Sequence, residues 1–433
     1  MSNWLQEDEQ YIWHPFTPLK GMEKPLVIES AKGVNLYTED GDKIIDVISS
    51  WWVNIHGHSH PKIAAAIYKQ ASELEHVIFA GFTHKPAINL AKRLIEVLPE
   101  NQSKIFFSDN GSTAVEVAIK MAFQFFYNEG KEKKRIIAID GAYHGDTFGA
   151  MSVGERGPFT EPFNPFMFDV DFLDFPTVEK EAAVFDRFNE LVKTGDVAAF
   201  IFEPIVQGAS GMRVYSKILL DKMIGVAQQH GVICIADEVM TGFGRLGTLF
   251  AADQLTNKPD IFCLSKGLTG GAIAMGVTSC TAEIQAAYQS NDLMKTFFHG
   301  HSFTANPITC AAANASLDIL LTDECEDNRK RLNQKHRSFL LKLEENEMVR
   351  NARVMGTILA FDLNTEIETS YFNEARSHLY PYFIAKGVLI RPLGNVIYLI
   401  PPYIISNEDL DFIYSTILNF LKEYKSMTFN QHD

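Results

Sequence analysis

The middle of the chain alternates short apolar runs with segments of helical spacing, and this alternation limits the folds that the chain can adopt. The apolar runs are KIFFSDN, RIIAID, VAAFIFEPIV, GVICIADE and DIFCLSK. Helical patterns such as residues 113–128 and 215–231 lie between them. Apolar runs between helices are typical of a mostly parallel sheet that is covered on both faces. The sequence therefore predicts an α/β fold.

Polar residues at the ends of two helical segments predict where those helices begin and end. Ser216 is placed as an N-cap and Gly231 as a C-cap of one helix, and Ser406 is placed to cap the closing helix of the chain.

Both ends of the chain depart from the central pattern. From about Asn306 a long helical stretch leads to a charged helix, two apolar strands and a closing helix, which predicts a smaller α+β domain. Residues 32–47 predict a β-hairpin. We therefore expect an N-terminal arm over residues 1–55 that contributes to the small domain, a large domain over 56–310 and a small C-terminal domain over 311–433.

Charge and cysteine content exclude some classes of protein. The chain has 39 Lys and Arg against 54 Asp and Glu, a formal net charge of −15, whereas nucleic-acid binding needs clustered cations. The five cysteines are an odd number without a Cys-x-x-Cys pair, which predicts neither a disulfide framework nor a zinc site. No apolar N-terminal signal and no apolar run of ~18 residues is visible, so we expect a soluble cytoplasmic protein without a membrane partner.

Residues after the first of these strands can form an anion site. Asn110 and Gly111 form a turn, and Thr113 with Glu116 has the spacing of a capping box that opens a helix. Backbone N–H groups at such a helix start, together with the hydroxyls of Ser112 and Thr113, can bind a phosphate. A well-capped helix without a ligand is the commoner explanation of this segment taken alone.

Two ionisable side chains follow later strands. Asp237 ends one strand, where a carboxylate can be a helix cap, a metal ligand or the partner of a heterocyclic nitrogen; no further ligands are evident, so we expect no metal. Lys266 ends the next strand, although lysine is rarely buried without a partner and often extends to the surface from such a position. A phosphate site, an acid and a desolvated amine together are the groups that hold pyridoxal 5′-phosphate. Burial would lower the pKa of the amine and leave it free to attack a carbonyl.

Four longer segments carry a family resemblance. They are DGAYHGDTFGAMS, ADEVMTGFGRLG, SKGLTGG and HGHSFTANP. As a set they resemble the motifs of the class III, fold type I PLP-dependent aminotransferases. The resemblance implies a large domain with a mostly parallel seven-stranded sheet, a smaller α+β C-terminal domain, an N-terminal arm that contributes to the active site, and a homodimer with active sites at its interface.

Three further segments resemble the branch of this family that acts in biotin synthesis. They are IWHPFT, SSWWVNIHGHSHP and IRPLGNVIYLIPPYII. The resemblance implies ping-pong transfer, through pyridoxamine phosphate, of an amino group from S-adenosylmethionine to 8-amino-7-oxononanoate. Lysine as the donor of the same step, or another class III ω-aminotransferase, remains an alternative.

The resemblance assigns residues to the cofactor. Lys266 matches the lysine that binds the cofactor covalently and shuttles a proton, and Asp237 matches the acid at the pyridine nitrogen. Gly111 and Ser112 match the phosphate site, and Tyr143 matches the aromatic residue that stacks on the cofactor ring and meets the substrate.

Other residues are assigned to the substrate and to the dimer. Arg391 matches the arginine that pairs with the substrate carboxylate. Phe16 stands where the family often has tyrosine, so a hydroxyl is absent there. The remaining matches are Trp51 in the substrate pocket, Gly300 near the substrate, and His301 with Ser302 as a phosphate-binding pair from the opposite subunit, where relatives often carry Pro-Thr.

Some roles and some classes of function stay open. Trp51 and Trp52 could instead pack in the core, and this is expected of one of them. Glu203 and Arg245 either orient the site or form structural ion pairs. His144 and Asp146 are candidates to support the groups that touch the ligands. A nucleotide-binding oxidoreductase would need a G-x-G-x-x-G after an early strand, and a PLP-binding regulator an added DNA-binding module; neither is evident in the sequence.

Overall fold

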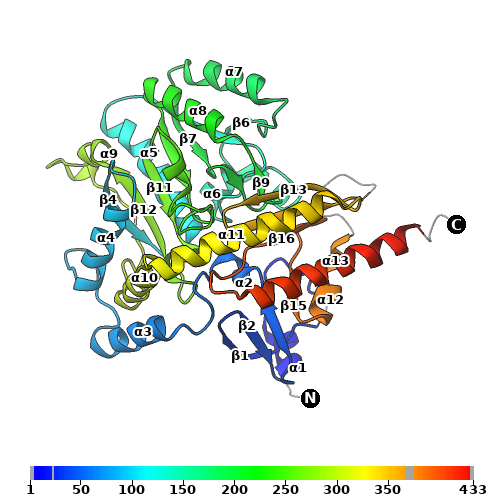
Figure 1. Cartoon of the computed structure of the whole chain (residues 1–433). Coiled ribbons are helices and arrows are strands. Elements are labelled where there is room, and N and C mark those ends of the chain that lie inside the picture. The colour runs from blue at the N-terminus through cyan, green and yellow to red at the C-terminus, as the bar shows by residue number, and fades with distance from the viewer. Residues whose placement is uncertain (1–3, 22–23, 366–374, 430–433) are drawn as a thin grey trace.

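A seven-stranded sheet forms the centre of the computed structural model, which describes residues 4–21, 24–365 and 375–429 (Figure 1). In spatial order its strands are β4 (Gln102–Ser108), β12 (Gly276–Thr281), β11 (Ile261–Leu264), β10 (Ile233–Asp237), β7 (Val197–Phe202), β5 (Arg135–Ile139) and β6 (Asp171–Leu173). Strand β12 pairs antiparallel with both of its neighbours, and the other pairs along the sheet are parallel. The predicted mostly parallel α/β sheet is confirmed.

Helices cover both faces of this sheet because its strands are apolar on both sides. In β10, Cys234 and Ala236 join one buried cluster, and Ile233 and Ile235 join the other. The first cluster is covered by α4 (Lys85–Val97), α7 (Glu181–Val192) and α8 (Lys217–Gln229), and the second by α5 (Gly111–Asn128), α6 (Phe148–Ser152) and α9 (Ala282–Ala286). Such two-sided burial explains why these runs show no polar alternation.

The C-terminal part builds a second layer. Its elements are α10 (Pro307–Leu320), α11 (Asp323–Glu344), β13 (Val349–Met355), β14 (Ile358–Leu363), α12 (Ala375–Ala385), β15 (Val388–Leu389), β16 (Val396–Leu399) and α13 (Asn407–Phe429). Strands β13, β14 and β16 form an antiparallel sheet. Helices α11 and α13 contact each other, with His336 Nδ1 lying 2.7 Å from the Tyr414 hydroxyl.

The N-terminal segment packs onto this second layer. It comprises α1 (Trp4–Tyr11), β1 (Ile28–Lys32), β2 (Asn35–Thr38), β3 (Lys43–Asp46), α2 (Ser49–Trp52) and α3 (Pro61–Glu73). The predicted hairpin is confirmed by the antiparallel pair β2–β3, and β3 also pairs in parallel with β15. Residues near 45 and 388 are therefore neighbours in one four-stranded sheet (Figure 1). The domain boundaries at 55 and 310 stay a prediction.

Short elements complete the connections. They are η1 (Glu161–Phe166), β8 (Val206–Gln207), β9 (Arg213–Val214), η2 (Ala251–Gln254), η3 (Lys266–Thr269) and η4 (Leu293–Lys295). None of the helices in the described ranges has both the length and the apolar character needed to cross a bilayer.

The two predicted N-caps are confirmed, and the predicted capping box is wrong. The Ser216 hydroxyl accepts from the Leu219 N–H at 3.2 Å, and Gly231 follows the C-cap residue His230 of α8 in a left-handed conformation with φ of 61°. The Ser406 hydroxyl accepts from the Asp409 N–H at 2.9 Å. The capping box at the start of α5, however, joins Asn110 and Thr113, because the helix begins at Gly111 rather than after Thr113.

Glu116, which the sequence placed in that box, has another role. Its carboxylate accepts from the N–H groups of Gly149 at 2.7 Å and Ala150 at 3.1 Å. These donors lie in the first turn of α6, where the backbone N–H groups have no partner within the helix. Glu116 therefore fastens α6 to α5.

The short element α2 is a left-handed turn of four residues that are not glycine. The φ angles of Ser49, Ser50, Trp51 and Trp52 are 51°, 44°, 70° and 74°. For such residues the left-handed region costs roughly 1–2 kcal/mol each. The turn therefore depends on contacts that hold it from outside.

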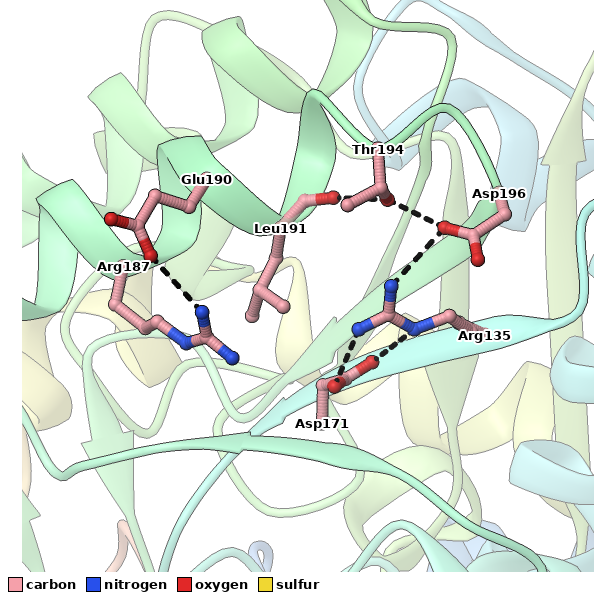
Figure 2. A network of polar contacts seen from close by, with 7 residues as sticks. All are labelled: Arg135, Asp171, Arg187, Glu190, Leu191, Thr194 and Asp196. Atoms are coloured by element: carbon pink, nitrogen blue, oxygen red, sulfur yellow. Dashed lines mark hydrogen bonds and ion pairs between the residues drawn. The ribbon is translucent and has the colours of Figure 1, made fainter.

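A polar network fastens the edge of the large sheet (Figure 2). The Arg135 guanidinium on β5 donates to both carboxylate oxygens of Asp171 on β6, at 2.7 and 2.8 Å, and to Asp196 at 3.2 Å. Thr194 donates to the same oxygen of Asp196. The bonds to Asp171 raise the pKa of Arg135. The network joins the short strand β6 to the turn between α7 and β7.

We expect Arg135→Lys to lower the free energy of unfolding by about 1 kcal/mol, since an ammonium cannot make the two parallel bonds of a guanidinium and the site is a third exposed. Urea unfolding followed by circular dichroism measures the change. Arg187→Lys is the control, because Arg187 forms an exposed pair with Glu190 on the same face of α7 and should change stability by less than about 0.5 kcal/mol. Equal effects of the two variants would contradict the network's role.

Candidate active site

A cavity of about 530 Å³ lies at the carboxyl ends of the parallel strands. Much of its wall comes from segments at the carboxyl end of a strand. These segments are residues 110–112 after β4, 143–147 after β5, Glu203 after β7, Asp237 after β10 and Lys266 after β11. The carboxyl ends of parallel strands meet at one edge of the sheet, so residues distant in the sequence converge here.

Lys266 projects into this cavity from the end of β11. Its Nζ lies 4.6 Å from the centre of the Trp52 ring, and the Trp52 side chain is buried and donates from Nε1 to the Tyr398 hydroxyl at 3.1 Å. Burial lowers the pKa of Lys266, partly opposed by the carboxylates of Asp237 and Glu203. The amine is therefore more readily neutral than an exposed lysine and is a better nucleophile.

Asp237 and His144 form a buried pair beside the amine. The Asp237 Oδ2 lies 2.6 Å from His144 Nδ1, and Oδ1 accepts from the Val239 N–H at 3.0 Å. The His144 Nε2 has no hydrogen-bond partner within the described structure. His144 thus fixes the direction of the Asp237 carboxylate. The sequence alone did not show that these two residues are in contact.

Two carboxylates hold Tyr143 at the cavity. Glu203 Oε1 accepts from the Tyr143 backbone N–H at 3.0 Å, and its Oε2 accepts from the Gly208 N–H at 2.9 Å. The Tyr143 hydroxyl donates to Asp146 at 2.9 Å. Burial, followed by the charge of Asp146, raises the pKa of Tyr143. Glu203 thus orients Tyr143 through its backbone, and no ion pair of Glu203 occurs among the described residues.

The start of α5 presents backbone N–H groups to the cavity with little room for side chains. A Cβ on Gly111 would lie 2.9 Å from Val239 Cγ1, and a Cβ on Gly145 would lie 2.0 Å from the Ser112 hydroxyl. The Ser112 hydroxyl accepts from the Asp146 N–H at 3.2 Å. The Thr113 hydroxyl donates back to Asp109 at 2.7 Å, so the prediction that it faces an anion is wrong.

A second group of predicted residues gathers around Trp51, outside the lining of the cavity. The Arg391 guanidinium is 4.8 Å from the centre of the Trp51 ring, and the Phe16 ring is 5.7 Å from it. Trp51 is 39% exposed and Trp52 is 4% exposed, so the two neighbouring indoles point into different surroundings. Trp52 is the one that packs in the core, and it also covers Lys266.

Other predicted residues do not reach the cavity in this single chain. Gly300, His301 and Ser302 precede α10, and the cavity lining contains none of them. Arg245 is buried and donates to the carbonyls of Trp52 at 3.1 Å and Pro401 at 2.9 Å. It forms no ion pair within the described ranges, so the alternative of a structural ion pair is wrong.

Several lining residues were not singled out from the sequence. They are Val239, Met240, Thr269, Ile273, Ala274 and Met275. Each lies two to nine residues after Asp237 or Lys266, and Met275 directly precedes β12, the strand that is antiparallel to both of its neighbours. Their closeness in sequence to Asp237 and Lys266 could have indicated that they line the cavity. Their apolar character alone could not distinguish residues of a cavity wall from residues of the hydrophobic core.

These groups fit pyridoxal 5′-phosphate. The cavity joins an amine of lowered pKa, a buried carboxylate and the N-terminus of an 18-residue helix whose first residue has no space for a Cβ. A helix N-terminus with a close backbone approach suits a phosphate, and the carboxylate suits a protonated ring nitrogen. The described residues hold no cluster of His, Cys, Asp and Glu that suits a metal ion.

Comparisons with known proteins point the same way. The profile of the family described as "Aminotransferase class-III" matches residues 19–421. The adenosylmethionine-8-amino-7-oxononanoate aminotransferase of Synechococcus elongatus is 48% identical over 95% of this chain and 99% of that protein. The protein of the same name from Geobacter sulfurreducens is 39% identical over 94% of each chain.

Solved structures share the fold. The crystal structure of the enzyme of that name from Methanocaldococcus jannaschii superposes with a TM-score of 0.92, at 34% identity, over 97% of this chain and 98% of that one. An amine transaminase from an uncultivated Pseudomonas species, solved in its PLP-bound form, gives a TM-score of 0.88 at 29% identity over 94% of this chain and 97% of that one. With a family profile that spans most of the sequence and relatives this similar along their full length, the chain belongs to the class III aminotransferase family.

Proposed function

We propose that this aminotransferase converts 8-amino-7-oxononanoate to 7,8-diaminononanoate, a step of biotin synthesis, with S-adenosylmethionine as the amino donor. The observation that carries the proposal is the junction of two groups. Lys266 and Asp237 form one in the cavity, and Trp51 and Arg391 form the other outside its lining; the two are linked through Trp52, which follows Trp51 in the chain and covers Lys266. The names of the relatives support the same reaction.

Residues of the cavity would hold the cofactor. Lys266 would bind its aldehyde, Asp237 its ring nitrogen, and the N–H groups at Gly111 and Ser112 its phosphate. Tyr143 would stack on the ring. When bound, pyridoxal 5′-phosphate supplies an electron sink for the charge that develops at the reacting carbon.

The chain itself supplies proton transfer and orientation. The neutral Lys266 amine would accept the proton from the amino donor's reacting carbon in the first half-reaction, and in the second it would deliver a proton to the former keto carbon of the acceptor. Asp237, which His144 holds in place, would face the ring nitrogen. Trp52 covers the amine from one side and limits the access of water.

The second group suits a long aliphatic acid. The Arg391 guanidinium pairs with the substrate carboxylate, and the rings of Trp51 and Phe16 contact its chain. The exposure of Phe16, 48%, leaves its ring accessible to a donor. Lysine as the donor remains the second candidate, because the absence of a hydroxyl at Phe16 removes one polar contact.

The proposal includes a homodimer. Gly300, His301 and Ser302 lie outside the cavity of their own chain, which is where residues that serve a partner's active site would lie. His301 Nε2 is buried without a hydrogen-bond partner in the described structure, so it has a free polar atom for a ligand.

We expect Lys266→Ala to lower the turnover rate by more than about 1000-fold, since it removes both the covalent link and the proton carrier. Borohydride reduction followed by mass spectrometry should label the parent protein at position 266 and leave the variant unlabelled. Lys222→Ala, at an exposed site on α8, is the control. Steady-state activity retained by Lys266→Ala would end the assignment.

We expect Arg391→Ala to raise KM for 8-amino-7-oxononanoate about 10- to 100-fold with a much smaller change in kcat, because a charge-assisted bond to the carboxylate is lost. Arg391→Lys keeps the charge, so its KM should lie between those of the parent enzyme and Arg391→Ala. An unchanged KM in Arg391→Ala would remove this residue from carboxylate binding.

The donor can be identified without the second substrate. Mixing the loaded enzyme with S-adenosylmethionine alone should convert the absorbance of the pyridoxal form to that of pyridoxamine phosphate. Conversion by lysine and not by S-adenosylmethionine would assign the alternative donor.

A further inference from the structure

The left-handed turn α2 depends on one buried carboxylate. Asp46, at the end of β3, is fully buried. Its Oδ1 accepts from the Ile48 N–H at 3.1 Å, and its Oδ2 accepts from the Ser50 hydroxyl at 2.7 Å and lies 2.9 Å from His58 Nε2. The backbone N–H of Ile48 and the side-chain hydroxyl of Ser50 thus meet one carboxylate, which fixes the entry to the turn.

Other groups hold Ser49 and Trp52, the first and last residues of the turn. The Ser49 hydroxyl donates to the Ile400 carbonyl at 2.7 Å, and the Trp52 carbonyl accepts from Arg245 at 3.1 Å. Trp52 Nε1 donates to the Tyr398 hydroxyl at 3.1 Å. None of these bonds involves Ser50, whose side chain reaches only Asp46 among the bonds of the described structure.

The conformation of this turn determines which way two adjacent indoles point. Trp52 is buried with its ring over the Lys266 amine, and Trp51 faces Arg391 with 39% of its surface exposed. Burial of Trp51 therefore does not compensate for its left-handed backbone. Strained backbone at a ligand site persists where surrounding bonds over-determine it.

We propose that Asp46 is a positioning residue of the active site: by holding Ile48 and Ser50 it keeps residues 49–52 left-handed, which sets Trp52 over Lys266 and Trp51 against Arg391. Asp46 does not line the cavity, so it acts through the turn and not on the ligands. The consequence for substrate binding rests on the proposed function. The consequence for Lys266 does not, since it can be measured without cofactor or substrate.

Release of the turn would change the surroundings of the amine. The charged groups that act on Lys266 are Asp237, Glu203 and Arg245, and burial is the largest effect on its pKa. If Trp52 moves away, water reaches Nζ and the ammonium form gains solvation. The pKa of Lys266 should therefore rise when the carboxylate at position 46 is removed, although Asp46 does not contact the lysine.

The first test uses apoprotein. The rate of arylation of Lys266 by fluorodinitrobenzene, followed by peptide mass spectrometry, is measured against pH in the parent chain, Asp46→Ala and Asp46→Asn. We expect the midpoint of the profile to rise by one pH unit or more in Asp46→Ala, a tenfold loss of reactivity below the midpoint, and by less in Asp46→Asn, which keeps one acceptor oxygen. Asp40→Ala, an exposed carboxylate on the same hairpin, controls for lost charge and should leave the midpoint unchanged.

A folded Asp46→Ala protein with the parent midpoint would overturn the proposal. A second pair of variants decides the matter if Asp46→Ala does not fold. Ser50→Ala removes the hydroxyl and keeps a side chain at φ of 44°, whereas Ser50→Gly removes the hydroxyl and the steric cost together. We expect a clear rise of the midpoint in Ser50→Ala and a smaller one in Ser50→Gly. Equal midpoints in both variants and the parent would also contradict the role of the Asp46–Ser50 bond.

In the loaded enzyme, the same variants should raise KM for the keto acid more than they lower kcat, since Trp51 moves relative to Arg391. A rise of the Lys266 midpoint without any change in KM would support the turn and contradict the placement of the substrate. This outcome separates failure of the proposed function from failure of the inference.

Discussion

The site depends on keeping a lysine amine out of water while leaving it reactive. Lys266 stands at the end of a buried strand, where desolvation favours the neutral amine and the nearby carboxylates of Asp237 and Glu203 favour the ammonium. This balance requires that both carboxylates are held in place. His144 fixes Asp237, and two backbone N–H groups fix Glu203, so neither carboxylate can move to form a direct ion pair that would keep the lysine permanently charged.

The parallel sheet explains how these groups meet. Asp237 and Lys266 end adjacent strands, β10 and β11, and Tyr143 and Glu203 follow β5 and β7. The strands are held rigidly because apolar side chains pack against both faces of the sheet. Trp51 and Arg391, the residues that we propose contact the substrate, come instead from an N-terminal turn and from the loop before β16. Besides the strand ends, the cavity is lined by Trp52 and Val53 of the N-terminal segment and by residues just before β12.

Much of the cofactor half could be predicted from the sequence, because strand ends converge by a general rule and Lys266 and Asp237 each follow an apolar run. The capping box was misplaced because Thr113 could pair with Glu116 after it or with Asn110 before it. Only the start of the helix at Gly111 shows that Asn110 is the partner. The role of Arg245 could not be assigned from the sequence, since its guanidinium donates to carbonyls that lie more than a hundred residues away along the chain. The left-handed turn was hidden because residues 49–52 contain no glycine to signal it.

The pairing of β3 with β15 has a consequence for the order in which the molecule can assemble. Bonds from Ser49 to Ile400 and from Trp52 to Tyr398 span 351 and 346 residues of sequence. Contacts of such separation form late, since a long loop must close first. The seven strands of the large sheet are complete by residue 281, whereas the turn that covers the lysine is held by residues near 400. A chain synthesised from its N-terminus therefore lacks the bonds that hold this cover until residues near 400 are available.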